Sequence, residues 1–161
     1  MSKIKNKKIF NFILLFSVFA LIVAYFIQYV LKHLPCNLCL IERIPYIFSI
    51  IIISISLFTG KFEKLSLIIL SLIFFSATLI SLYHFGIEQG FIKESLVCDL
   101  NNKSNDLSKE ALLNQLKKMP ISCKDVTFKI FGLSLATFNI FISFILSVIT
   151  TKLFLAYEKN R

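Results

Sequence analysis

The stretch Ile9–Leu31, IFNFILLFSVFALIVAYFIQYVL, runs for 23 residues without an acidic or basic side chain. A helix rises about 1.5 Å per residue, so this stretch is long enough to cross a hydrocarbon core of roughly 30 Å. Three more uncharged stretches follow, Ile44–Gly60, Leu65–Ile87 and Ile130–Thr151. With 57% hydrophobic residues, 18 Phe and no Trp, the chain is too apolar for an ordinary soluble domain. The sequence predicts an all-α membrane protein, a bundle of four transmembrane helices.

We expect the spans at about 9–31, 40–60, 65–87 and 130–151, with outward loops at 32–39 and 88–129, in a single membrane domain over residues 1–161. The second uncharged stretch has only 17 residues, so its helix should begin before Ile44. That places Cys39 and Arg43 at the membrane boundary, open to a lipid-soluble ligand. The first stretch is longer than the apolar part of a signal peptide, and no small-residue cleavage site follows it, so we interpret it as a span.

Basic residues gather on one side of the predicted bundle. The N-terminus, the turn between the second and third spans and the tail hold nine Lys and Arg against two acids, whereas the opposite side holds nine against seven. Because short cytoplasmic flanks carry an excess of Lys and Arg, we expect both termini in the cytoplasm. The net charge of +9 is then a topology signal rather than a sign of nucleic-acid binding. The outward side, where disulfides persist, holds all four cysteines, Cys36, Cys39, Cys98 and Cys123.

The long outward loop contains one predicted helix. Its apolar residues Leu112, Leu116 and Met119 recur at helical spacing within Leu107–Met119, and Pro120 ends the pattern. This short amphipathic helix fits the outer membrane surface, and packing against a partner protein fits equally well.

The segment CNLCLIER at residues 36–43 joins the first two spans. Thiols at Cys-x-x-Cys spacing are commonly acidified and easily oxidised and reduced. Arg43 follows Cys39 by four residues, so on a continuous helix its guanidinium would lie over the sulfur and favour the thiolate. Pro45 leaves two alternatives: a helix that already runs at Cys36 and is bent, or a helix that starts near Ile41 and leaves the cysteines on a preceding turn.

Three roles fit four outward cysteines. Structural disulfides are one, although a helical bundle has little need of them, and a zinc site is another, although 98 and 123 lack the close spacing of a zinc ribbon. We favour the third, in which a solvent-accessible loop disulfide exchanges with a protein partner and then with the Cys-x-x-Cys pair. No flavin, haem or nucleotide motif occurs in the chain, so the electrons need an acceptor from outside, and a quinone in the bilayer is suitable. Arg43 would stabilise negative charge on the quinone oxygens, and we expect no metal.

Two further ionisable residues are of interest: Glu42, within this segment, and His84, near the end of the third span. His84 fits either an interfacial position or a place beside the thiol and quinone chemistry. Glu42 diverges from Arg43 on a helix, and we interpret it as a local ion partner or a solvated side chain rather than a catalytic base.

Over essentially its whole length the chain resembles the DsbB family of inner-membrane, quinone-dependent thiol oxidases. The resemblance rests on Pro35, the Cys-x-x-Cys and Glu42-Arg43, on His84, on the loop cysteines, and on the Phe-Gly-Leu-Ser at 131–134. It implies that Cys98 and Cys123 form the disulfide that oxidises a periplasmic DsbA-like protein, with Cys98 attacked first. It also implies a transient bond between Cys36 and Cys123, and a quinone, ubiquinone or menaquinone, near Cys39, Arg43 and His84.

Two rival functions remain. An enzyme of the vitamin K epoxide reductase type also combines a Cys-x-x-Cys, two loop cysteines and a quinone, but its loop pair precedes the Cys-x-x-Cys in the chain. The other rival is a non-catalytic membrane subunit with structural disulfides.

Overall fold

The computed structural model describes residues 2–60, 62–93, 123–124, 129–130 and 132–159, with the backbone alone at 2–6 and 129–130. Four helical segments in these ranges are long and apolar enough to cross a membrane: Lys7–Tyr29, Asn37–Thr59, Glu63–Glu88 and Leu135–Lys159. The predicted all-α membrane bundle is therefore confirmed. Cys98 and the amphipathic helix predicted at Leu107–Met119 lie outside the described residues.

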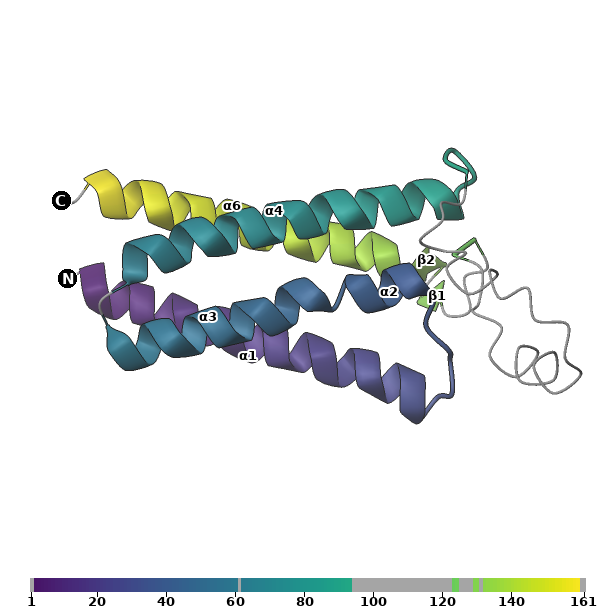
Figure 1. Ribbon diagram of the computed structural model, residues 1–161, viewed down its shortest axis with the longest axis horizontal. Helices are drawn as coiled ribbons and strands as arrows, with labels where there is room; N and C mark the ends of the chain where they lie inside the picture. The colour runs from purple at the N-terminus through teal and green to yellow at the C-terminus, as the bar shows by residue number, and fades with distance from the viewer. Residues whose placement is uncertain (1, 61, 94–122, 125–128, 131, 160–161) are drawn as a thin grey trace, which may run out of the picture.

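The long helices α1 (Ser2–Tyr29), α3 (Ile44–Thr59), α4 (Glu63–Glu88) and α6 (Leu135–Lys159) run lengthwise through the bundle, and both chain ends lie at the same end of it (Figure 1). The short helix α2 (Asn37–Ile41) and a hairpin of β1 (Lys129–Ile130) and β2 (Leu133–Ser134) lie at the opposite end. Contacts are most extensive between α4 and α6, followed by α1 with α3 and α3 with α4. The contact between α1 and α6 is small, so these two helices pack loosely against each other.

The second span is broken near its N-terminal end, which neither predicted alternative foresaw in full. Helix α2 begins directly after Cys36 and ends at Ile41, and α3 starts at Ile44 with Pro45 in its first turn. A proline ring has no N–H to donate and clashes with the carbonyl four residues earlier, which here is that of Ile41. The helix consequently stops at Ile41 and restarts at Ile44, after two intervening residues.

The fourth span begins later than the predicted residue 130. Antiparallel pairing of Lys129 with Ser134 and of Ile130 with Leu133 forms a tight hairpin before it. Gly132 has a φ of +83°, a left-handed conformation that favours glycine. Residues 129–130 and 133–134 therefore form a hairpin that leads into α6 at Leu135.

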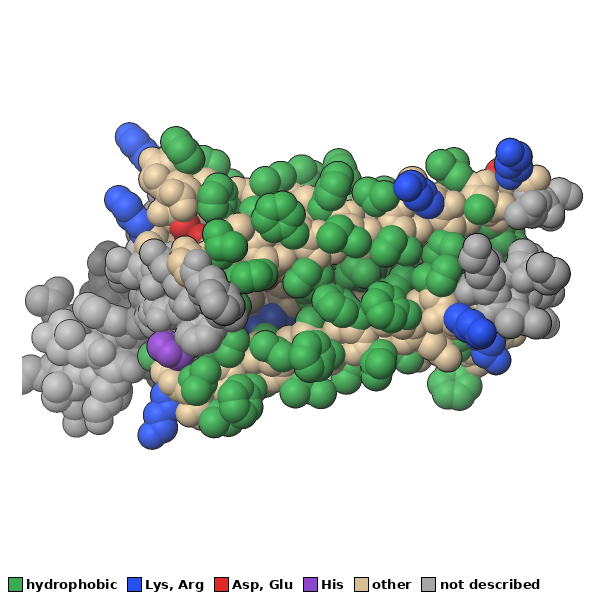
Figure 2. Space-filling model, turned by 180° about the vertical axis from the view of Figure 1, so that it is seen from behind, with side chains coloured by type: hydrophobic (Ala, Val, Ile, Leu, Met, Phe, Trp, Pro, Cys, Tyr) green, Lys and Arg blue, Asp and Glu red, His purple; other side chains and the backbone are tan. Residues whose placement is uncertain are grey.

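Apolar side chains fill the middle of the bundle, and small polar side chains bring the helices close together. The fully buried residues include Ile13, Ile53 and Phe74. Ser49 on α3 donates to Ser17 on α1 over 3.0 Å, a hydrogen bond that joins the two helices. Large hydrophobic side chains cover the outside along the bundle, and most Lys and Arg lie toward its two ends (Figure 2). This surface suits lipid.

Candidate redox site

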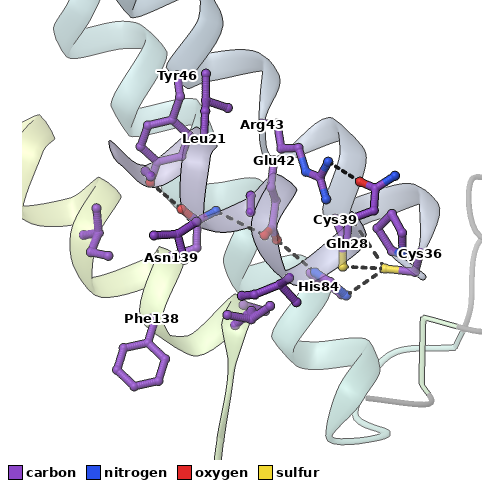
Figure 3. Close-up of a pocket in the computed structure, with 18 of the residues that line it drawn as sticks. Leu21, Gln28, Cys36, Cys39, Glu42, Arg43, Tyr46, His84, Phe138 and Asn139 are labelled. Atoms are coloured by element: carbon purple, nitrogen blue, oxygen red, sulfur yellow. Dashed lines mark hydrogen bonds and ion pairs between the residues drawn. The ribbon is translucent and has the colours of Figure 1, made fainter. Parts of the chain in front are cut away.

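The Cys-x-x-Cys pair lies at the start of α2, with both thiols free and close together. Cys36 precedes the helix as its N-cap, and its sulfur accepts from the backbone N–H of Cys39 over 3.3 Å. The two Sγ atoms are 2.9 Å apart (Figure 3). Cys36 is buried and Cys39 is partly exposed, so the two sulfurs have different surroundings.

His84 on α4 contacts Cys36 directly. Its Nε2 lies 3.5 Å from Cys36 Sγ and its Nδ1 lies 2.9 Å from Glu42 Oε1 (Figure 3). The ring is 2% exposed. His84 is therefore buried within the bundle, and the geometry supports the alternative of a place beside the thiol chemistry.

The donors around Cys36 stabilise its thiolate. Hydrogen bonding from the Cys39 thiol is the largest influence and His84 adds a second hydrogen bond and its positive charge, while burial of the sulfur acts in the opposite direction. Together they lower the pKa of Cys36 from 9.0 to about 4. The acidified sulfur of the pair is thus Cys36, whereas the spacing of Arg43 had favoured Cys39.

Glu42 is a buried ion partner, not a solvated side chain. It is 8% exposed and sits at the break between α2 and α3. One of its oxygens faces His84, and the other accepts from Asn139 Nδ2 on α6 over 3.1 Å. Its partner is therefore His84 rather than the neighbouring Arg43, and α2, α4 and α6 meet at this carboxyl group.

A second carboxyl group, that of Glu88, also faces His84. Glu88 Oε1 lies 3.7 Å from His84 Nε2, and its side chain is 6% exposed. Its Oε2 has no hydrogen-bond partner within the described part of the chain. In the sequence Glu88 opens the predicted loop at 88–129, although its spacing of four residues from His84 would place the two side chains together on one helix.

Arg43 points to α1. Its Nη1 donates to Gln28 Oε1 over 2.6 Å, and its guanidinium carbon lies 5.0 Å from the centre of the Tyr25 ring. The predicted stacking over Cys39 assumed a continuous helix, and the break at 42–43 removes that premise. Arg43 nevertheless lines the same cavity as Cys39.

Cys123 is disulfide-bonded and lies in the same buried cluster as Cys36. It is 2% exposed and packs in a group with Cys36, Leu38 and Ile87. Cys98 lies outside the described residues, so its predicted pairing with Cys123 stays a prediction. Cys123, from the segment between α4 and α6, thus packs in the same buried cluster as the Cys-x-x-Cys pair.

A cavity of about 370 Å³ opens beside the two thiols. Apolar side chains from α1 and α6 form most of its wall, among them Phe16, Leu21 and Phe138. Its polar lining includes Gln28, Arg43, Tyr46 and Asn139, with Cys36, Cys39, His84 and Cys123 at one part of the wall. It can accept a largely apolar ring that carries a few hydrogen-bond acceptors.

The donor set also bears on metal binding. Ligand atoms of Cys36, Cys39 and His84 lie within 4.8 Å of one another. Two sulfurs on one tetrahedral zinc ion at about 2.3 Å each would be about 3.8 Å apart, whereas these are 2.9 Å apart. The arrangement suits exchange between two sulfurs better than it suits zinc.

Comparison with known proteins identifies the family. The family model described as disulfide bond formation protein DsbB matches residues 6–153. The chain belongs to the DsbB family. An uncharacterized protein of Rickettsia prowazekii (strain Madrid E) is 31% identical over 156 residues, which cover 95% of this chain and 90% of that protein. No solved structure gives a significant match.

The resemblance drawn from the sequence is thereby confirmed, and the DsbB family is one of disulfide bond formation. In this DsbB-family membrane protein, the structure brings Cys36, Cys39, Arg43, His84 and Cys123 to one cavity. Asn139 on α6 also lines this cavity, and the sequence alone did not mark it as a site residue. Its only signal was an amide within an apolar span.

Proposed function

We propose that the protein reoxidises a DsbA-like thiol oxidase outside the cytoplasm and passes the electrons to a membrane quinone. The observation that carries the proposal is the position of Cys123, whose buried sulfur packs in one cluster with Cys36. A loop sulfur in that place is close to the thiol pair with which it must exchange.

The proposed relay proceeds by thiol–disulfide exchange. A partner thiolate attacks Cys98 of a Cys98–Cys123 disulfide and releases Cys123, which attacks Cys36 of a Cys36–Cys39 disulfide and releases Cys39 as a thiolate. The partner's second thiol then displaces Cys98, and Cys98 attacks Cys123 and releases Cys36. Low thiol pKa favours departure, so the pKa of about 4 for Cys36 suits that last step. In sum, a partner dithiol becomes a disulfide, and Cys36 and Cys39 become a dithiol.

The cavity fits a quinone by size and lining. When bound, a quinone would supply an acceptor for the two electrons that leave Cys36 and Cys39 as they form a disulfide. Arg43, held by Gln28 and Tyr25, would present positive charge to a quinone oxygen. Apolar side chains of α1 and α6 would hold the ring and exclude water.

We further propose that the protein resides in a bacterial inner membrane, with both termini in the cytoplasm and the cysteines on the periplasmic side. The charge distribution of the sequence supports this orientation. The termini lie at one end of the bundle and α2, which holds Cys39 and follows Cys36, lies at the other (Figure 1).

The test is quinone reduction by the purified protein, with ubiquinone and menaquinone analogues, with and without a reduced DsbA-like donor. We expect donor-dependent reduction that Cys36→Ser and Cys39→Ser abolish. Cys98→Ser should prevent the mixed disulfide with the donor, as detected by mass spectrometry. Full turnover by any of these variants would refute the relay. Disulfides that never exchange with the donor would indicate a structural role instead.

A further inference from the structure

The amide of Asn139 uses all of its hydrogen-bonding capacity at the centre of the site. Its Nδ2 donates to Glu42 Oε2 over 3.1 Å and to Ser81 Oγ over 2.8 Å. Its Oδ1 accepts from the Tyr46 hydroxyl and from Ser143 Oγ over 3.3 Å. An amide offers two donors and two acceptor positions, and each has a partner here. The orientation of Asn139 is therefore fixed from four sides.

Those partners decide which end of the amide faces Glu42. An ionised carboxyl group only accepts hydrogen bonds, so the NH₂ end must face it. With one oxygen held by Asn139, the other lies 2.9 Å from His84 Nδ1. That oxygen requires a proton on Nδ1, which leaves Nε2 as the ring atom toward Cys36.

We propose that Asn139 is a positioning residue, which holds Glu42 against His84 and so presents Nε2 of the ring to the sulfur of Cys36. The inference rests on the proposed function, since it concerns the thiol pair of that relay. Asn139 has no hydrogen bond to either sulfur, within the contacts of the described residues, and acts through Glu42 and His84. Its bond to Ser81 also ties α6 to α4 one turn before His84.

Several ionisable groups surround the contacts that lead from Asn139 through Glu42 and His84 to Cys36. Those that face His84 are Glu42 from the α2–α3 junction, Glu88 from α4 and Cys36. Cys39 faces Cys36, and the same cavity is lined by His33, Arg43 and Tyr46. Of these, Glu42 and Tyr46 are direct partners of Asn139. Removing the amide should therefore act on the thiol through Glu42.

The experiment measures the rate of iodoacetamide alkylation at Cys36 in the reduced full-length protein between pH 4 and pH 9, read by peptide mass spectrometry. Asn139→Leu removes the donor, and Asn139→Asp replaces it with an acceptor that repels Glu42. We expect either change to move the alkylation midpoint up by about one pH unit, so that alkylation is about tenfold slower on the acidic side. Asn139→Gln keeps an amide and should restore most of the wild-type profile.

A matched control removes another hydrogen bond between α4 and α6. Thr151 Oγ1 lies 2.7 Å from Ser71 Oγ, about 18 Å farther along α6 from Asn139. Thr151→Val should leave the Cys36 profile unchanged. An equal shift in Thr151→Val would mean that loosening of the bundle, not positioning, moves the thiol, and would overturn the inference.

A second measurement needs no change at Asn139. The chain has two histidines, so ¹⁵N-histidine labelling with a His33→Gln variant for assignment isolates the His84 signals. We expect a protonated Nδ1. An unprotonated Nδ1, or an unshifted midpoint in folded Asn139→Asp, refutes the inference. Neither readout uses quinone or partner, so a failure of wild-type quinone reduction would count against the proposed function alone.

Discussion

Replacement of His84 by Asn isolates one of the two contacts of the ring. The amide nitrogen of Asn occupies about the position of Nδ1 in His, so His84→Asn can still donate to Glu42 while the atom that contacts Cys36 is gone. A hydrogen bond to a charged group contributes about 1.5–3 kcal/mol, and one pKa unit corresponds to 1.36 kcal/mol. The pKa of Cys36 should therefore rise by about one to two units from about 4.

The sign of the effect determines where it is visible. The hydrogen bonds from Cys39 and His84 depress the pKa of Cys36 below its usual 9.0, so the wild-type thiolate is present above about pH 4 and is lost only below it. In His84→Asn the loss should begin at a higher pH, and near pH 4 alkylation of Cys36 should fall about 5- to 50-fold. Above pH 9 both proteins should react alike, because Cys36 is ionised in each.

The assay is iodoacetamide alkylation of Cys36 in the reduced protein, measured by mass spectrometry from below pH 4 to above pH 9. His84→Gln is an informative contrast, because its longer amide reaches toward the Nε2 position and can still donate to the sulfur. His33→Asn controls for the loss of a histidine from the same cavity. A midpoint in His84→Asn that matches wild type would refute the assignment of His84 as a stabiliser of the thiolate.

Three further predictions concern the cavity and the packing of the bundle. Arg43→His should raise the apparent KM for quinone in steady-state reduction, and an unchanged KM would remove Arg43 from the quinone site. Ser49→Ala removes the 3.0 Å bond to Ser17, so the free energy of unfolding in detergent should fall by about 0.6–1.7 kcal/mol, and no loss would mean that the bond adds nothing. Gly60 ends α3 at φ +62° with open space around it, so Gly60→Ala should cost about 1 kcal/mol through backbone strain alone, measurable as a lower midpoint of thermal unfolding.

The fold was largely predictable because lipid imposes a simple requirement on the sequence. Four uncharged stretches of sufficient length can satisfy their backbone groups in a bilayer only as helices. Their ends were less predictable. Pro45 allowed two alternatives for the start of the second span. Because Pro45 has no N–H to donate to the carbonyl of Ile41, the helix is broken after Ile41. The hairpin before α6 has only two residues in each strand, too few for an alternating pattern.

The site was predictable where the chemistry of a residue type is narrow. Cysteines at close spacing in a membrane protein have few roles, and His84 was named as a candidate beside the thiols. Arg43 was assigned the wrong neighbour because i, i+4 spacing holds only within an unbroken helix. Asn139 and Glu88 were missed because a single sequence does not fix how each helix is rotated in the bundle, and that rotation decides which polar side chains meet.

The burial of Cys36 and Cys123, at 5% and 2% exposure, has a consequence for electron flow. Glutathione, a charged tripeptide larger than iodoacetamide, would reach these sulfurs less readily, so in the proposed relay it would be a poor competitor for either one. In the proposed relay, oxidising equivalents held on these sulfurs would then not be lost to reductants free in solution. Selectivity would be set by the burial of the sulfur atoms as much as by their reduction potential.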